Sequence, residues 1–163
     1  MKKHLEGSGY HYGWNDISLI AQTRGIKDVP IFDPNHPEIF STRDMLGTLS
    51  KLLDTDDIPT ILSSCYLSLA TCYNNTIQQI RETTNKNYTK VYIVGGGCRD
   101  RYLNQLTCDV TALEVYTGPS EAASLGNLVS QLLYFDPSLT IADLRKIVIN
   151  STEDERECYT PTI

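Results

Sequence analysis

Hydrophobic positions recur at helical spacing along most of this chain. Asn15 or Asp16 can cap a helix that ends at Gly25, because side-chain oxygens satisfy the first backbone N–H groups and glycine ends helices well. Ser41 with Asp44 forms a pattern typical of a capping box, which predicts a second helix. That helix carries apolar residues on one face: Met45, Leu46, Leu49, Leu52 and Leu53.

The longest predicted helix has Pro59 near its first turn, where proline is tolerated. Its apolar residues recur every three or four positions, which predicts one continuous stripe buried in the core. We expect no cofactor contact from this stripe. It consists of Ile61, Leu62, Cys65, Tyr66, Leu69, Cys72, Tyr73, Ile77 and Ile80.

Only two strands are evident, at residues 91–94 and 114–117, where β-branched and aromatic residues gather. Helices are predicted from Ser120 to about Leu133 and, behind a capping box at Thr140, through about Ile149. The pattern indicates an α/β fold that is rich in helices and has few parallel strands. Two strands make an incomplete sheet, so we expect the first strand to need a partner at its edge.

A glycine turn stands between the first strand and the next helix. Gly95, Gly96 and Gly97 have no Cβ, so a ligand can approach the backbone, and the following helix start offers N–H groups to an anion such as phosphate. A phosphate-binding P-loop is excluded, because Cys98 stands where its lysine would be needed. Asp100 stands where a dinucleotide fingerprint needs its third glycine.

Two interpretations of this turn remain open at this point. Glu114 lies about where a ribose-binding carboxylate would be expected, which keeps a Rossmann-type dinucleotide-binding domain as an alternative. Asp100 can equally cap a helix behind a purely structural turn.

Composition limits the partners and the compartment. The net charge of −6 disfavours nucleic acid and anionic membranes, which are bound chiefly through clustered Lys and Arg. No apolar run approaches the roughly 20 residues that span a bilayer, and residues 1–13 contain no signal-peptide core. We therefore expect a cytoplasmic protein. The three histidines show no ligand spacing, so no metal site is predicted.

The five cysteines are odd in number and contain no C-x-x-C pair, so neither a disulfide framework nor a zinc site is indicated. Cys65 and Cys72 are expected to be core thiols. Cys98 follows the glycine turn at a helix start, where the helix dipole can lower a thiol pKa and create a reactive thiolate. The favoured interpretation of Cys98 is a small residue in a nucleotide loop.

Three segments carry a family resemblance. Residues 95–109, which begin Gly-Gly-Gly-Cys-Arg-Asp, resemble the adenosine motif of the FGGY carbohydrate kinases. Residues 117–127 resemble the second C-terminal signature of that family, and residues 33–45 resemble a segment of its rhamnulokinase branch. The chain is thus similar to a rhamnulokinase-like C-terminal domain, and we expect it to be a fragment whose opening strands are missing.

The resemblance implies ATP-dependent phosphorylation of a ketose or related sugar on an actin-like, ribonuclease-H-like fold. It also implies that the catalytic aspartate, the sugar pocket and the metal-coordinating carboxylates lie upstream of the matched region, so no catalytic or metal residue is expected here. ATP or ADP with Mg²⁺ is the implied cofactor, the metal being held mainly by the nucleotide and the missing half. The implied nucleotide-binding residues are Gly95, Gly96, Gly97, Asp100, Arg101 and Asn104.

One departure from the family concerns Asp100, because relatives commonly carry asparagine there. Asp109 ends the motif, and we expect it to make hydrogen bonds that fix the loop. Residues 1–150 are assigned to the nucleotide-binding domain, and residues 151–163 to an acidic tail that we expect to be solvated and partly disordered.

Three functional interpretations follow. The first is the nucleotide-binding part of a sugar kinase, inactive alone, marginally stable and prone to self-association through an exposed sheet edge. The second is a noncatalytic remnant or interaction module. The third is the Rossmann-type domain. The residues that would identify the sugar should lie outside this chain.

Overall fold

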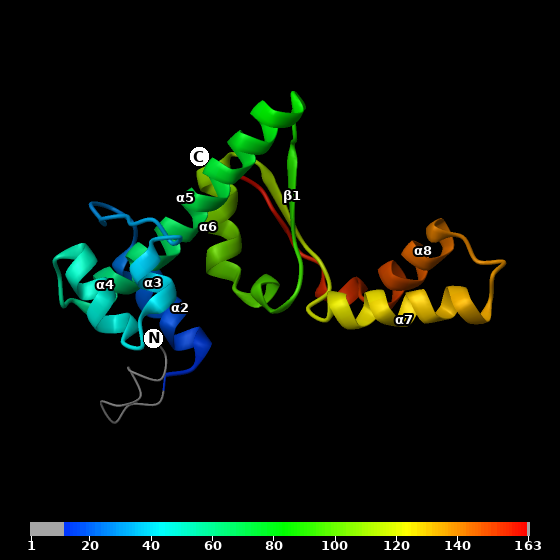
Figure 1. Cartoon of the computed structure of the whole chain (residues 1–163), viewed down its shortest axis with the longest axis horizontal. Coiled ribbons are helices and arrows are strands. Elements are labelled where there is room, and N and C mark those ends of the chain that lie inside the picture. The colour runs from blue at the N-terminus through cyan, green and yellow to red at the C-terminus, as the bar shows by residue number, and fades with distance from the viewer. Residues whose placement is uncertain (1–11, 163) are drawn as a thin grey trace. The chain divides into compact units, whose positions relative to one another are not determined.

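The computed structural model describes residues 12–162, which divide into two compact units between Asn87 and Tyr88. Figure 1 labels helices α2 to α8 and strand β1.

The first unit is made of helices. Its core contains Leu49, Leu53 and Ile61, against which Phe32 and Cys65 pack among others. Burial raises the pKa of the Cys65 thiol to about 12, in keeping with the expected core thiol. The helices of the described part are α2 (Trp14–Arg24), α3 (Pro37–Ser41), α4 (Met45–Leu53) and α5 (Ile58–Thr84).

Helix α5 buries the first part of the predicted apolar stripe, namely Ile61, Leu62 and Tyr66. Serines line its inner face: the hydroxyl of Ser63 donates to the carbonyl of Ala21 in α2 at 2.8 Å, and the hydroxyl of Ser68 accepts from the N–H of Phe32 at 3.0 Å. These short side chains let α2 and the following segment come close. The later part of the stripe is wrong as a core prediction, because Tyr73 is 38% exposed and Ile80 is 43% exposed.

Two predicted helix starts also differ. Gly13 is the N-cap of α2, and its N–H donates to the Asp16 carboxylate at 2.7 Å. Asp44 caps α4 alone, because its carboxylate accepts from the N–H of Gly47 at 3.0 Å. Ser41 instead closes α3. Aspartate side chains do take part in both helix starts, as the sequence predicted. The spacing of polar residues along the sequence did not, however, identify which residue is the N-cap.

The second unit contains a three-stranded mixed sheet in the order β1 (Lys90–Ile93), β2 (Glu114–Thr117), β3 (Cys158–Tyr159). Strands β1 and β2 are parallel, whereas β2 and β3 are antiparallel. The two predicted strands are confirmed to within one residue. Strand β3 was missed because it has only two residues, and its pairing contradicts the expectation of a disordered tail.

Helix α6 (Arg101–Thr111) connects β1 to β2 and packs against β2 and β3. It contributes Leu106 and Cys108 to a core that also contains the fully buried Val115. Between β1 and α6 lies a short 3-10 helix, η1 (Gly96–Arg99). The strand, glycine turn and helix predicted from sequence are therefore present in that order.

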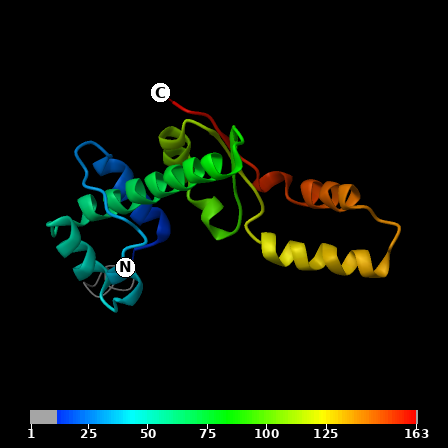
Figure 2. The same ribbon diagram turned by 45° about the horizontal axis from the view of Figure 1, so that its top comes forward.

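Helices α7 (Ala122–Phe135) and α8 (Ile141–Ser151) form a hairpin, which Figure 2 shows from a second direction. The capping box of α8 is confirmed, with Thr140 and Asp143 bonded to each other's backbone N–H groups. None of the residues of α7 is buried, and Leu128 is 53% exposed. Its 14 residues include no charged side chain.

Candidate functional site

The glycine turn presents an open backbone surface. Gly95 has φ +79°, a conformation that residues with a Cβ rarely adopt, and it lets the chain turn sharply out of β1. A Cβ added at Gly96 or Gly97 would meet no other heavy atom within 4 Å. The absence of side chains at these two positions is therefore not required by packing within the described chain. It leaves the backbone accessible to a ligand.

A second turn, at residues 118–120, is held against the first. The Gly95 N–H donates to the carbonyl of Pro119 at 3.0 Å, and the Gly118 N–H donates to the carbonyl of Ile93 at 2.8 Å. A Cβ on Gly118 would lie 2.6 Å from Cγ1 of Val94, so this glycine is required by close packing. The two turns follow the carboxyl ends of the parallel strands β1 and β2, where open α/β sheets bind their ligands.

Asp100 and Arg101 stand at the start of α6. The Asp100 carboxylate caps the helix by accepting from the N–H of Leu103 at 3.1 Å. Arg101 is 79% exposed and forms an ion pair with Glu157. Both side chains are thus placed beside the glycine turn, Asp100 as a helix cap and Arg101 as an exposed cation.

Asn104 has a supporting position. It is fully buried, and its Nδ2 donates to the carbonyl of Cys98 at 2.8 Å, which fixes the end of the glycine turn to α6. Its Oδ1 has no hydrogen-bond partner within residues 12–162. The sequence showed that Asn104 was near the turn but not that it faces the core.

A hollow of about 430 Å³ lies beside η1 and the start of α6. Basic and acidic side chains meet there. The acidic residues come from the C-terminal tail, a contribution that sequence reasoning missed because the tail read as a solvated run of charge. The lining residues are Cys98, Arg99, Arg101, Thr117, Asp154, Glu155 and Glu157.

Cys98 is unsuited to the reactive role that was considered for it. The residue is only 7% exposed, and burial, followed by the negative charge of Glu155, raises the pKa of its thiol despite the opposing charge of Arg99. The structure supports the interpretation of a small residue packed beneath the turn.

Asp109 does not fix the glycine turn as expected. Its Oδ1 accepts from Nε2 of Gln105 and from both the N–H and the hydroxyl of Thr162, each at 2.9 Å. Asp109 therefore ties residues beyond β3 to α6.

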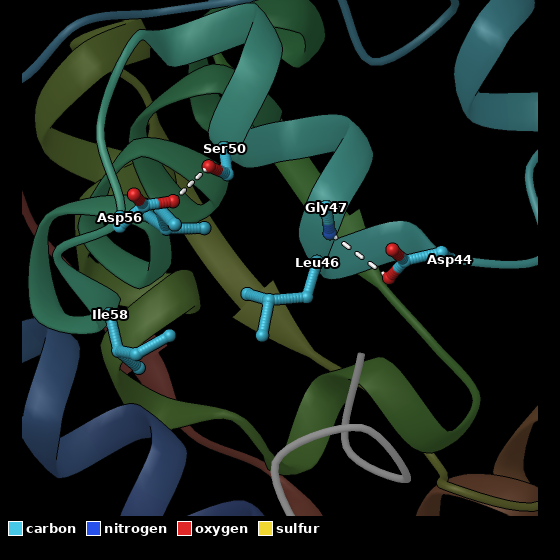
Figure 3. Close-up of a pocket in the computed structure, with 7 residues that line it drawn as sticks. Asp44, Leu46, Gly47, Ser50, Asp56 and Ile58 are labelled. Carbon is cyan, nitrogen blue, oxygen red and sulfur yellow. Dashed lines mark hydrogen bonds between the residues drawn. The ribbon is translucent and has the colours of Figure 1, made fainter.

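Another hollow, of about 320 Å³, belongs to the first unit and is shown in Figure 3. It contains two carboxylates, but Asp44 caps α4 and Asp56 accepts a hydrogen bond from Ser50. Among residues 12–162 no three His, Cys, Asp or Glu side chains gather as a metal site would require. None of the helices in this range is long and apolar enough to cross a membrane.

Comparison with known proteins defines the class. The model of the FGGY family of carbohydrate kinases, C-terminal domain, matches residues 16–134, and the chain therefore belongs to this family. The glycine turn, the second turn and residues 33–45 all fall inside the match.

One relative is the rhamnulokinase of Halalkalibacterium halodurans, which is 28% identical over 153 residues. The alignment covers 90% of this chain and 33% of that protein. The chain thus spans about a third of the length of this curated relative.

Proposed function

We propose that this chain is the nucleotide-binding part of an ATP-dependent sugar kinase. The observation that carries the proposal is the open backbone of Gly96 and Gly97, joined to a second turn at the carboxyl ends of two parallel strands. Membership of a carbohydrate kinase family supports it and replaces the Rossmann interpretation. Similarity to a rhamnulokinase favours a ketose or related sugar as the substrate of the whole enzyme.

The residues of the turn divide into two roles. Gly95, Gly96 and Gly97 let the nucleotide approach the backbone, and Asp100 and Arg101 reach its ribose or phosphates. Asn104, which is buried, positions the turn from behind instead of touching the ligand.

The fit to a nucleotide rests on the exposed backbone and on the arginines beside it, Arg99 and Arg101. Bound ATP would supply the phosphoryl group, and its Mg²⁺ would be held by the phosphates and by residues outside this chain. This chain would bind and orient one side of the nucleotide, which matters because positioning and charge neutralisation dominate phosphoryl transfer. We expect the chain alone to transfer no phosphoryl group.

The finer assignments belong to the same proposal. Residues 1–150 form a nucleotide-binding domain of the actin-like, ribonuclease-H-like type, residues 151–163 form its tail, and the protein works in the cytoplasm. The sugar is bound mainly by the remainder of the kinase. β1 is an end strand of the described sheet, so its outer edge can accept a strand from that remainder or from a second copy of this chain.

The direct test is thermal melting of the purified chain with and without Mg-ADP. A ligand that binds only the folded state must raise the melting temperature. The Cβ of Gly96→Leu would meet no heavy atom of the described residues within 4 Å, so this variant should melt as the wild type does without nucleotide and lose the nucleotide-induced shift.

Gly126→Leu is the matched control, because Gly126 is also unobstructed but lies on α7. This variant should keep the nucleotide-induced shift. A wild-type chain that melts cooperatively with no shift at saturating Mg-ADP would reject nucleotide binding and favour the noncatalytic remnant.

A further inference from the structure

The C-terminal tail is anchored through its backbone. The Thr117 N–H donates to the carbonyl of Glu157 at 2.9 Å, and the Glu157 N–H donates to the Thr117 hydroxyl at 2.7 Å. Strand β3 follows at once. The tail backbone is therefore part of the sheet, and its carboxylates project from this anchored backbone.

These carboxylates neutralise the positive groups of the hollow beside the glycine turn. Oε2 of Glu155 accepts from the N–H of Ser120 at 2.7 Å, and Nη2 of Arg99 donates to the hydroxyl of the same serine at 2.9 Å. Glu157 pairs with Arg101. Hydrogen bonds from Ser120 lower the pKa of Glu155, and a hydrogen bond from Tyr159, followed by Arg101, lowers the pKa of Glu157. Both groups are charged at neutral pH.

A phosphate would use the same groups. Guanidinium ions and backbone N–H groups at turns and helix starts bind phosphate oxygens as they bind carboxylate oxygens. The hollow contains three carboxylates, Asp154, Glu155 and Glu157, against two guanidinium ions. In this arrangement, the arginine side chains and the Ser120 N–H that would bind a phosphate already have hydrogen-bond partners. The side chains that line the hollow also carry a net negative charge, which repels a polyanionic ligand.

We propose that Glu155 and Glu157 form an autoinhibitory contact with the glycine-turn site, and that the phosphates of a nucleotide enter only when these carboxylates turn away. This inference rests on the proposed nucleotide-binding function. The Arg101–Glu157 pair is exposed, with 79% and 36% of the two side chains accessible, and exposed pairs contribute little. The contact therefore weakens nucleotide binding severalfold and does not abolish it.

The test is calorimetric titration of the whole chain with two probes, ADP and adenosine. Glu157→Gln keeps the size of the side chain and frees Arg101, so ADP should bind about two- to fivefold more tightly, the range expected when an exposed ion pair is removed. Adenosine, which has no phosphate, should bind unchanged. The gain for ADP should disappear in an Arg101→Gln background.

Asp154→Asn is the matched control, because Asp154 lines the same hollow and, in the described chain, pairs with neither arginine. It should tighten ADP binding less than Glu157→Gln does. Glu155→Gln provides a second variant, and melting without ligand checks that each protein folds.

The outcomes separate the two proposals. If the wild type binds ADP and Glu157→Gln binds it no more tightly, or no more tightly than Asp154→Asn does, the autoinhibitory contact is wrong and nucleotide binding stands. If neither probe binds the wild type or any variant, both proposals fail. ADP binding that appears only in Glu157→Gln or Glu155→Gln would support the contact strongly.

Discussion

At the scale of single residues, the glycines of the two turns are present for different structural reasons, which the sequence alone does not distinguish. Gly118 is required by packing, since a Cβ there would press on Val94, whereas Gly96 and Gly97 face open space. The sequence predicted the turn and its glycines. It could not distinguish these purposes, because that depends on contacts between segments about 20 residues apart.

Gly118→Ala should destabilise the chain by about 1–3 kcal/mol, since the new methyl group overlaps a β-branched side chain that has few rotamers. Urea unfolding measures the change. Val94→Ala in the same chain should recover most of the loss.

Gly126→Ala is the control for this substitution, because it adds the same methyl group where no heavy atom of residues 12–162 lies within 4 Å of it. Alanine favours a helix over glycine, so this variant should be as stable as the wild type or more stable. Equal losses at positions 118 and 126 would contradict the packing argument.

Asn104→Ala should cost about 1–3 kcal/mol, because the buried carbonyl of Cys98 would lose the side chain that donates to it. The exposed Asn127→Ala is the control and should change stability little. Melting without ligand reports the effect. If Asn104→Ala left the melting temperature unchanged while abolishing ADP binding, Asn104 would contact the nucleotide directly and its supporting role would be refuted.

At the scale of elements, hydrophobic periodicity predicted where the long helices lie in the sequence, but it predicted poorly which of their residues are buried. Helix α5 was expected to bury apolar residues along its whole length, yet serines mediate its close contacts and its later part exposes Tyr73 and Ile80. A two-residue strand such as β3 carries no periodicity, and its residues directly follow a run of charged residues. Local pattern therefore predicted the long elements, but it predicted neither the short strand β3 nor the surfaces that the helices cover.

The start of α8 gives a pH-dependent prediction. Hydrogen bonds from Thr140 lower the pKa of Asp143 below its usual 3.8. A lowered carboxyl pKa stabilises the folded chain fully above pH 3.8, and the stabilisation is lost as the pH falls below that value. Thr140→Ala should therefore reduce stability near neutral pH, because the cap is lost, and flatten the fall in stability below pH 4.

Amide hydrogen exchange in α8, followed from pH 7 to pH 3, would measure this effect. Ser130→Ala in α7 removes a hydroxyl that donates to a backbone carbonyl and involves no carboxylate, so it should leave the pH dependence unchanged. A Thr140→Ala profile parallel to that of the wild type would contradict the assignment.

At the scale of the whole molecule, the sequence identified the family because three motifs follow one another in the family's order. The assignment of residues 1–150 to one nucleotide-binding domain stays a proposal. Contacts within the described chain form two compact units that divide between Asn87 and Tyr88. The tail contributes both a strand and carboxylates to the second unit. Such long-range partnerships leave no local signal and were not predictable from the chain alone.

The segment between the units should be the first site of tryptic cleavage within residues 12–162. Residues 85–89 are exposed and lie outside any helix or strand, and Lys86 is among them. Brief digestion should give two fragments that correspond to the two units, as mass spectrometry would show. Lys86→Gln should slow this cleavage. A first cut inside α5 or α6 would contradict the division of the chain into two units between Asn87 and Tyr88.

The late position of β3 has a consequence for synthesis. Thr117 ends β2 and Cys158 begins β3, so 158 − 117 = 41 positions separate the two partners. At the usual rates of translation, about 2–8 s pass between their appearance. During that interval, the edge of β2 that later pairs with β3 has no partner strand. A chaperone that shields nascent strands would have to bind this edge within those seconds.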